Sequence, residues 1–447
     1  RQPDIVVGAR HDSPLVVGLG EGENFLGSDV AAFVAYTKRA MEVDQDQAVC
    51  VSADKVIVTD FDGNVVENPK TYTVDWDASA AEKGGWDSFM DKEIHEDPAA
   101  VQRTLLGRFD ANGGITLDEV RIDEHDFKAI DKIIVVACGT ASYAGQVAKY
   151  AIEHWVRIPV EIELAHEFRY RDPILTPRTL VVAISQSGET MDTLMALRHA
   201  REQGSKVLAI CNTQGASIPR ESDAVLYTHA GPEVAVASTK AFVAQITAAY
   251  LLGLYLAQVK GAMFRDEIHQ VLDSLKDMPR KIQWVLDTQP KTIQAAAERM
   301  VNANSFLFLG RHVGYPVALE GALKLKEIAY VHSEAYPAGE LKHGPISLIE
   351  EETLVVALAT VEKLFDKTMA NVREVKARGA HVIAIVKEGC TDAETVADTV
   401  LYIPKTADLF TSTLTVVPMQ LFAYYTAIEL GCDVDKPRNL AKSVTVE

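Results

Sequence analysis

A cluster of hydroxyl side chains directly follows an apolar run in the sequence Ser-Gln-Ser-Gly-Glu-Thr, residues 185–190. The apolar run at 179–184 predicts a buried strand, and the residues after the loop predict a helix that begins near Glu189 or Thr190. A helix N-terminus attracts anions, and hydroxyl groups donate hydrogen bonds to phosphate oxygens. Because no Gly-Lys-Ser/Thr sequence is present, a phosphorylated metabolite fits this loop better than a nucleoside triphosphate. The alternative is a plain helix cap by Ser187.

Two further loops carry hydroxyl groups. The sequence Cys-Gly-Thr-Ala-Ser at 138–142 ends another predicted strand, and its glycine allows a ligand to approach the backbone. Parallel strands bind ligands beyond their carboxyl ends, so Thr140 is expected at the same sheet edge as Ser185. The sequence Val-Ala-Ser-Thr-Lys at 236–240 is a weaker indication, because Ser238 could simply cap the helix that follows.

Three ionisable residues fall on one stripe of the mostly apolar segment 315–332, which predicts a helix with Pro316 in its first turn. Glu320, Lys324 and Glu327 are spaced four and then three residues apart. The stripe is either a solvated row of salt bridges or a set of groups that faces a site. The apolar surroundings imply burial, and the pattern by itself leaves both interpretations open.

Two more candidate groups lie in segments that usually have no chemical role. His343 stands in a Gly/Pro-rich stretch, 335–345, that predicts a loop, and a histidine in a loop is usually exposed. Lys442 lies in the C-terminal segment 433–447, where fraying is the ordinary expectation. The apolar residues around Lys442 favour docking instead, and a desolvated lysine amine can react with a carbonyl group.

The elements that must position these residues form a repeat. From about residue 125, short apolar strands alternate with helical stretches, which indicates a parallel sheet covered on both faces. The series returns at an offset near 172–175 residues, with strand-like segments at 305–312, 353–360, 381–387 and 398–404. A constant offset predicts two copies of one α/β domain. The second copy has Ala-Thr-Val-Glu-Lys-Leu where the first has the hydroxyl loop, which favours a ligand role for those hydroxyls over a purely structural one.

Composition excludes several classes of partner and site. The net charge of −19 argues against nucleic acid or an anionic membrane as the main partner. Five cysteines without C-x-x-C spacing predict a reducing, cytoplasmic protein. The charge-free stretch 241–259 predicts a buried helix and not a membrane span. No ligand spacing typical of metals is present, so neither a metal nor another cofactor is expected.

The motifs at 138–142, 185–190, 236–240, 320–327 and 339–345 and the C-terminal sequence Pro-Arg-Asn-Leu-Ala-Lys-Ser together resemble the glutamine–fructose-6-phosphate amidotransferase family. The resemblance implies an α/β fold of two tandem sugar isomerase (SIS) domains, whose parallel sheets are flanked by helices. An antiparallel, β-rich remnant of an Ntn-type glutaminase domain precedes them. The implied boundaries are 1–75 for the incomplete C-terminal part of the glutaminase domain, 76–123 for a linker and connecting helices, 124–264 and 297–437 for the two SIS domains, 265–296 for helices between them, and 438–447 for an active-site tail.

The resemblance also implies roles for the candidate residues. Four side chains are expected to bind the phosphate of fructose 6-phosphate, namely Ser185, Gln186, Ser187 and Thr190. Thr140 and Ser238 are expected to line the sugar site. Lys442 is expected to form a Schiff base with the C2 carbonyl, and Glu327 to move a proton between C1 and C2 beside Lys324. His343 is expected to open the sugar ring from the neighbouring subunit, which implies a homodimer.

The implied reaction converts fructose 6-phosphate and glutamine to glucosamine 6-phosphate and glutamate. The sequence differs from the family in two features that limit this expectation. Ala141 stands where the family has serine, with Ser142 one place later. The chain begins at Arg1, which predicts a cut end, and none of its cysteines matches the glutaminase nucleophile, so sugar-phosphate isomerase activity is the most that we expect of it. The alternatives are a stand-alone aldose–ketose isomerase or deglycase, and a non-catalytic sugar-phosphate sensor.

Overall fold

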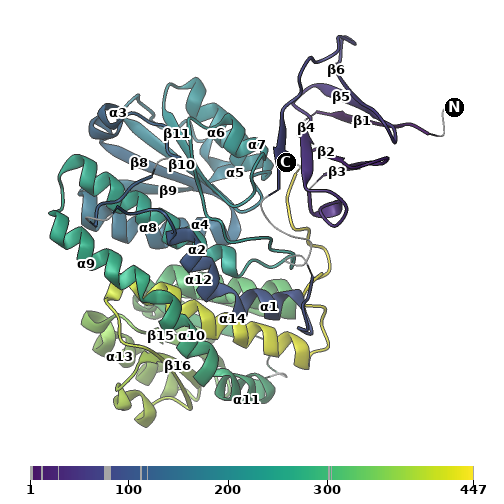
Figure 1. The fold of residues 1–447 in the computed structure, drawn as a ribbon. Helices are drawn as coiled ribbons and strands as arrows, with labels where there is room; N and C mark the ends of the chain where they lie inside the picture. Colours follow the sequence, from purple (N-terminus) through teal and green to yellow (C-terminus); the bar gives the residue numbers. More distant parts are fainter. Residues whose placement is uncertain are drawn as a thin grey trace.

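The computed structural model describes residues 4–445 apart from 12–13, 29, 75–81, 111–112, 118, 301–302 and 304. The predicted boundary at residue 75, the start of the predicted linker and the last two residues of the predicted tail lie outside the described residues. A small β-rich N-terminal part stands beside a larger helical and α/β body (Figure 1).

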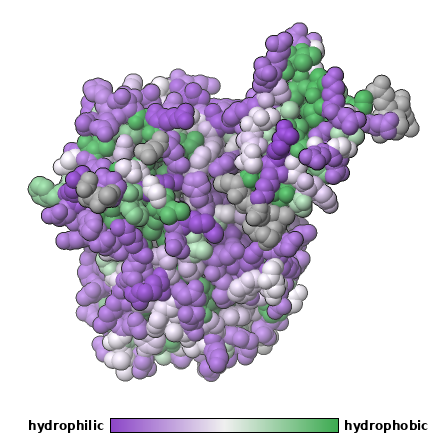
Figure 2. Space-filling view, in the orientation of Figure 1, coloured by the Kyte–Doolittle hydropathy of each residue, from purple (hydrophilic) through white to green (hydrophobic). Residues whose placement is uncertain are grey.

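The N-terminal part consists of two antiparallel sheets, as the alternating sequence predicts. One sheet has the order β1-β5-β6 and the other the order β3-β2-β4-β7. The strands are β1 (Val6–Arg10), β2 (Val16–Leu19), β3 (Asn24–Gly27), β4 (Arg39–Glu42), β5 (Gln47–Val51), β6 (Val56–Asp60) and β7 (Thr71–Thr73). Hydrophobic residues gather on the outer surface of this part (Figure 2), and Val6, Val7, Phe61 and Val65 are more than half exposed.

Among the described residues between the N-terminal part and the first α/β domain, three helices are present. They are α1 (Phe89–His95), α2 (Asp97–Leu105) and α3 (Glu124–Ala129). Helix α2 begins at Asp97 with Pro98 in its first turn, where the fixed φ of proline suits a helix start and its missing N–H costs no hydrogen bond. Ser88 caps α1 by accepting a hydrogen bond from the Asp91 amide.

The first α/β domain is a parallel five-stranded sheet with the order β12-β11-β10-β8-β9. Its strands are β8 (Lys132–Ala137), β9 (Val160–Leu164), β10 (Thr179–Ser185), β11 (Lys206–Cys211) and β12 (Ala224–Tyr227). Its helices are α4 (Gly139–Val156), α5 (Ala165–Phe168), α6 (Met191–Glu202), α7 (Ser217–Glu221) and α8 (Lys240–Lys260). Strand β10 lies at the centre and is buried along its whole length, as expected for a continuous apolar run.

The second α/β domain repeats this order as β17-β16-β15-β13-β14, which confirms the predicted duplication. Its strands are β13 (Ser305–Gly310), β14 (His332–Pro337), β15 (Leu354–Ala359), β16 (His381–Lys387) and β17 (Thr399–Ile403). Its main helices are α12 (Gly314–Lys324), α13 (Phe365–Lys376) and α14 (Thr411–Glu429). Helices α9 (Arg265–Lys276), α10 (Met278–Thr288) and α11 (Pro290–Met300) join the two domains.

Helix α8 is the element that the charge-free stretch predicts. It is long and apolar enough to cross a membrane, but 83% of its most apolar window is buried inside the chain. Its Tyr250 is fully buried and packs edge-on against Trp155 of α4, with ring centroids 5.4 Å apart. Gly253 permits the close approach of α4, because a Cβ there would lie 2.9 Å from Ile152. The helix is therefore the core of the first domain.

One predicted helix and one predicted loop are wrong in part. The segment 315–332 is not a single α-helix, because α12 ends at Lys324 and a π-helical turn, η3 (Leu325–Ala329), follows. Tyr330 then takes a left-handed conformation with φ 57°, and β14 begins at His332. The stretch 335–345 is not an open loop but the end of β14 followed by the 3-10 helix η4 (Ala338–His343). Pairing with β13 in the repeated sheet overrides the local helical pattern here.

Candidate active site

The hydroxyl loop after β10 is held in shape by its own hydroxyl groups. The Ser185 and Thr190 hydroxyl oxygens are 3.0 Å apart, and Ser185 Oγ also accepts a hydrogen bond from the Gly188 amide at 3.0 Å. Helix α6 begins at Met191, and Thr190 is its cap residue without a capping side-chain hydrogen bond. Ser187 instead accepts a hydrogen bond from the Glu189 amide within the loop. The interpretation of Ser187 as the helix cap is therefore wrong.

Gly188 gives the loop its tight turn. Its φ is +70°, and a Cβ at this position would lie 2.6 Å from the Ala216 side chain and 2.8 Å from Cys211 Sγ. Glycine is required on both counts, since a side chain would be strained in this conformation and would collide with α7 and β11. The close fit fixes the neighbouring hydroxyl groups against the end of the sheet.

A cavity of about 120 Å³ lies beside this loop. The side chains that line it include all six predicted substrate-binding residues together with the predicted Schiff-base lysine, namely Thr140, Ser185, Gln186, Ser187, Thr190, Ser238 and Lys442. Two buried atoms of the lining, Ser238 Oγ and Gln245 Oε1, have no hydrogen-bond partner among the described residues. Buried polar atoms are normally paired, so both are available to a polar ligand.

Lys442 reaches this cavity because hydrogen bonds along the C-terminal segment dock it on the rest of the chain. The Asp435 carboxylate accepts hydrogen bonds from the amides of Phe89 and Met90 at the start of α1, at 3.0 and 2.9 Å. The Arg438 amide donates to the Tyr330 hydroxyl at 2.8 Å. The Val444 carbonyl accepts a hydrogen bond from the Met191 amide at the start of α6. The expected fraying of a terminus does not apply here.

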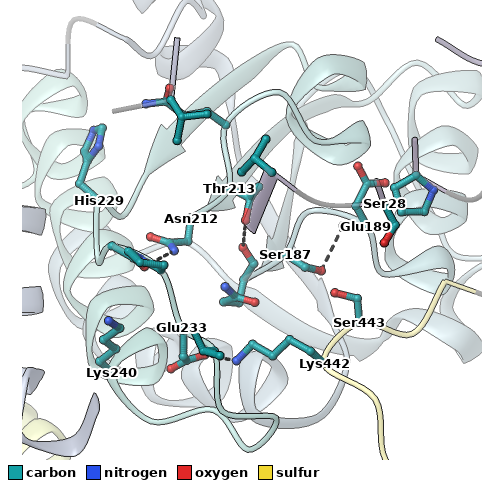
Figure 3. Close-up of a pocket in the computed structure, with 18 of the residues that line it drawn as sticks. Ser28, Ser187, Glu189, Asn212, Thr213, His229, Glu233, Lys240, Lys442 and Ser443 are labelled. Carbon is teal, nitrogen blue, oxygen red and sulfur yellow. Dashed lines mark hydrogen bonds and ion pairs between the residues drawn. The ribbon is translucent and has the colours of Figure 1, made fainter. Parts of the chain in front are cut away.

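The Lys442 ammonium points into the first domain toward Glu233 (Figure 3). Its Nζ lies 2.7 Å from Glu233 Oε2 and donates to the Ala235 carbonyl at 2.7 Å. Burial opposes ionisation of Glu233, but the charge of Lys442 and the amides of Thr239 and Ala241 outweigh it and lower its pKa.

The charged stripe of α12 and η3 contacts Thr140 of the cavity lining. Lys324 Nζ is 3.3 Å from Glu320 Oε1 and 2.5 Å from Glu327 Oε2, and it donates to Thr140 Oγ1 at 3.2 Å. Burial raises the pKa of Glu320 to about 7. Burial alone disfavours the charged form of Lys324, yet the two glutamates raise its pKa. The stripe is thus a buried ion cluster that touches the cavity through Thr140, and the interpretation as a solvated salt-bridge row is wrong.

The π-helical turn η3 directly follows Lys324 and continues α12. A π turn widens the helix by one residue and is found frequently at functional sites. In this chain it carries Glu327, which keeps its carboxylate on Lys324 and is 22% exposed, whereas Glu320 is fully buried.

Three of the predicted site residues do not line this cavity, namely Lys324, Glu327 and His343. Lys324 contacts its lining through Thr140, and Glu327 contacts Lys324. His343 is exposed at the end of η4 and does not line the cavity within the chain. Ala141 lines the cavity, whereas Ser142 is buried and donates its hydroxyl to the Gly139 carbonyl at 2.9 Å. Ser142 therefore does not supply the hydroxyl group that Ala141 lacks.

A second, larger cavity of about 700 Å³ separates the N-terminal part from the first α/β domain. Gln186, Ser187, Glu233 and Lys442 line both cavities, so these residues stand between them. Arg10 of β1 crosses this boundary, with its guanidinium 3.9 Å from Glu189 in the hydroxyl loop. The N-terminal part is thereby in direct contact with the loop.

Glu233 and Gln245 are the site residues that the sequence did not reveal. Glu233 stands in an irregular segment, Gly-Pro-Glu, with no periodic pattern around it, and Gln245 is the first polar residue inside the charge-free helix. The interruption of the apolar run by Gln245 was the available signal. Among the residues that the structure describes, no group of three or more His, Cys, Asp and Glu side chains is arranged to hold a metal ion.

The sequence matches one family model and several named relatives. The SIS domain model matches residues 127–255 and 299–430. Glutamine–fructose-6-phosphate aminotransferase (isomerizing) of Corynebacterium diphtheriae is 62% identical over 449 residues, which span all of this chain and 72% of that protein. The enzyme of the same name from Streptomyces coelicolor is 60% identical over all of this chain and 73% of its own length.

A solved structure agrees with these relatives. The C-terminal domain of glucosamine-fructose-6-phosphate aminotransferase from Francisella tularensis superposes with a TM-score of 0.76 at 40% identity, over 80% of this chain and all of that one. The similarity over the whole of this chain indicates one family. The duplicated sheets and the cavity at the end of β10 agree with that family. The chain belongs to the glutamine–fructose-6-phosphate aminotransferase (isomerizing) family and covers its isomerase part, which consists of two SIS domains.

Proposed function

We propose that the cavity of about 120 Å³ binds fructose 6-phosphate with its phosphate on the hydroxyl loop. The observation that carries the proposal is that the hydroxyl groups of one strand end, an unpaired Ser238 hydroxyl and the Lys442 side chain line the same small cavity. The start of α6 faces this loop, and the partial positive charge of a helix N-terminus favours a phosphate. Binding energy from the phosphate holds the reacting carbons in place.

Lys442 is the proposed nucleophile. Its amine attacks the C2 carbonyl of the open-chain sugar, water leaves, and a Schiff base forms at C2. The Schiff base acidifies the neighbouring C–H bonds, so that a single carboxylate can carry a proton between C1 and C2. Lys442 suits this role because its side chain is only 24% exposed and the docked tail fixes its backbone.

Glu327 is the proposed carrier of that proton, with Lys324 as its partner. The two side chains form an ion pair at 2.5 Å, and Lys324 also touches Thr140 of the cavity lining. Lys324 thereby orients the Glu327 carboxylate and links it to the sugar site. Glu320, which is fully buried behind them, balances the charge of Lys324.

His343 is the proposed ring-opening group, supplied by a second copy of the chain. The residue is exposed and lies outside the cavity of its own chain, which agrees with use by a neighbour. A homodimer is therefore part of the proposal. A cytoplasmic location is proposed as well, because five cysteines are free and the longest apolar helix is buried inside the fold.

The test is the conversion of fructose 6-phosphate by the purified chain, followed by NMR of the hexose phosphates. We expect glucose 6-phosphate to appear, and we expect Lys442→Ala to abolish its formation. Reduction with cyanoborohydride during turnover should attach the sugar to Lys442, as read by peptide mass spectrometry. Unchanged substrate and no adduct, with a folded dimer, would contradict the enzyme assignment of this site and favour a binding protein.

A further inference from the structure

The carboxylate that pairs with Lys442 belongs to Glu233, which has no role in the proposed chemistry. Glu233 has a fully buried side chain, and its Oε2 lies 2.7 Å from Lys442 Nζ. The ion pair forms the wall between the small cavity and the larger one, since both residues line both. The charge of the reactive amine is therefore balanced at a fixed point next to the sugar site.

The other carboxylate oxygen of Glu233 is held by main-chain groups. Glu233 Oε1 accepts hydrogen bonds from the amides of Thr239 and Ala241, at 2.9 and 3.0 Å, at the start of α8. These amides would otherwise lack partners, and a carboxylate at a helix N-terminus is favoured by the helix dipole. The same turn carries Ser238, so that the Glu233 carboxylate sets Lys442 relative to the cavity lining.

We propose that Glu233 is a positioning residue for the Schiff-base lysine, which orients the Lys442 amine and serves as the counter-ion of the charged nitrogen before and after condensation. This inference rests on the proposed function. The lone pair of nitrogen forms the C–N bond at C2, the C–O bond breaks, and the oxygen leaves as water with two protons from the ammonium group. The nitrogen is positively charged at both ends of the step, so one fixed carboxylate can serve both.

Glu233 lies among other charged groups, and these decide which carboxyl group is ionised. The groups near it are Glu93 of α1, Asp97 of α2, Lys240 of α8, Lys324 of α12 and Lys442 of the tail. Burial, with repulsion from Glu233 as the next cause, raises the pKa of Glu93 to about 8 and raises that of Asp97 well above its ordinary value. Of these three buried acids, Glu233 is the one whose pKa is lowered, because Lys442 and two amides stabilise its charged form against burial.

The experiment measures trapping of fructose 6-phosphate on Lys442 by cyanoborohydride between pH 5.5 and 9, in the full chain and in Glu233→Gln. The glutamine oxygen can still accept from the α8 amides, so the variant should fold, which circular dichroism checks. We expect trapping at pH 7 to fall by about 10- to 100-fold, because the amine is no longer held in place. We expect the pH of half-maximal trapping to shift toward acid, because the positively charged nitrogen no longer faces the Glu233 carboxylate.

Two further variants separate charge and position from a merely structural effect. Glu233→Asp keeps the charge and should keep the pH of half-maximal trapping close to that of the parent chain, with reduced yield. Glu161→Gln is the matched control, because Glu161 of β9 pairs with a lysine outside both cavities, Lys132, at 2.9 Å, and it should leave the trapping profile unchanged. If Glu233→Asp and Glu233→Gln both trap with the profile of the parent chain, the inference is wrong while the proposed function stands. If the parent chain itself traps no sugar, the proposed function fails and the inference fails with it.

Discussion

Lys324 and Glu320 form an ion pair at 3.3 Å in which neither side chain has more than 1% of its surface exposed. Both residues come from α12 of the second domain, yet their hydrogen bonds to Thr140 join them to the first. A buried ion pair costs desolvation energy, so a fold retains one only where its members satisfy each other. Through Thr140 this cluster therefore links the two domains beside the cavity proposed for the sugar.

Replacement of Lys324 by methionine tests how much this cluster contributes to stability. The substitution keeps the length of the side chain and leaves Glu320 and Glu327 without their shared cation. We expect the free energy of unfolding to fall by about 3 to 5 kcal/mol, as for other buried pairs that lose one member. Urea denaturation followed by circular dichroism at pH 7.5 measures the change.

Lys376→Met is the matched control for that experiment. Lys376 pairs with Asp398 at 2.8 Å, which is closer than the Lys324–Glu320 contact, but both members are 30% exposed. Solvent screens such pairs, so the loss should stay below about 1 kcal/mol. Equal losses in the two variants would contradict the view that burial makes the Lys324 cluster important.

Stability should decline as pH rises from about 4.5 to 8. Burial raises the pKa of Glu320 to about 7 and that of Glu93 to about 8 in the folded state. The folded chain therefore binds more protons than the unfolded chain in this window, and the free energy of unfolding decreases with increasing pH. The stabilisation is complete below the unfolded pKa and is lost as pH passes the folded values. The decline should be on the order of a few kcal/mol in denaturation curves taken at pH 5 to 8.

Glu93→Gln should make the free energy of unfolding fall less steeply between pH 6 and 8. Glutamine can accept the same amide hydrogen bonds from Val234 and Ala235, but it does not ionise. Glu374→Gln serves as the comparison, since the Lys342 pair lowers the pKa of Glu374 and its contribution falls in the acid range. A slope that is the same in all three proteins between pH 6 and 8 would show that Glu93 is not the titrating group.

The site residues that the sequence predicted belong to local patterns. Thr140, Ser185 and Ser238 each follow a buried strand or precede an apolar helix, so their place at one sheet edge follows from the parallel topology. Glu233 was not predictable in this way, because its partner Lys442 is 209 positions away and the pairing depends on how the tail docks. Contacts of this length are set by tertiary packing and leave no periodic trace in the sequence.

The second domain shows the same limit for secondary structure. Leu325, Ile328 and Ala329 continue the apolar spacing of α12, and nothing in their types distinguishes a π turn from an α-helix. The π turn is explained by β14, because this strand must start at His332 to pair with Ser305 and the helix has to end before it. Strand β9 occupies the corresponding place in the first domain, so a strict use of the repeat would have predicted β14.

Ser187→Ala tests the phosphate role of the hydroxyl loop. Ser187 lines the cavity, and its removal takes away one hydroxyl contact to a charged ligand, worth about 1.5 to 3 kcal/mol. We expect the KM for fructose 6-phosphate to rise by about 10- to 100-fold with a smaller effect on kcat. Thr360→Ala, at the corresponding turn of the second domain, should leave KM unchanged. A similar rise in KM for both variants would indicate a general loss of stability and no phosphate contact by Ser187.

Ala141→Ser tests the consequence of the missing hydroxyl in the proposed sugar site. Ala141 lines the cavity, and Ser142 cannot substitute for it because its hydroxyl is bound to Gly139. A serine side chain at 141 would place one more donor beside the ligand and should lower KM by about 2- to 10-fold, in line with one additional neutral hydrogen bond. An unchanged KM, measured with the same isomerase assay, would show that position 141 faces no polar group of the sugar.

Complementation between two inactive variants tests whether His343 acts across a dimer. Lys442→Ala removes the proposed nucleophile and His343→Ala the proposed ring-opening group, and each variant by itself should be inactive. If each site combines Lys442 of one subunit with His343 of the other, a mixed dimer has one site with both lesions and one intact site. An equal mixture that exchanges subunits freely should therefore recover about a quarter of the parent activity. A mixture of Lys442→Ala with Lys442→Arg carries both lesions at the same position and should stay inactive. If native mass spectrometry shows mixed dimers but the first mixture recovers nothing, His343 does not serve the neighbouring site.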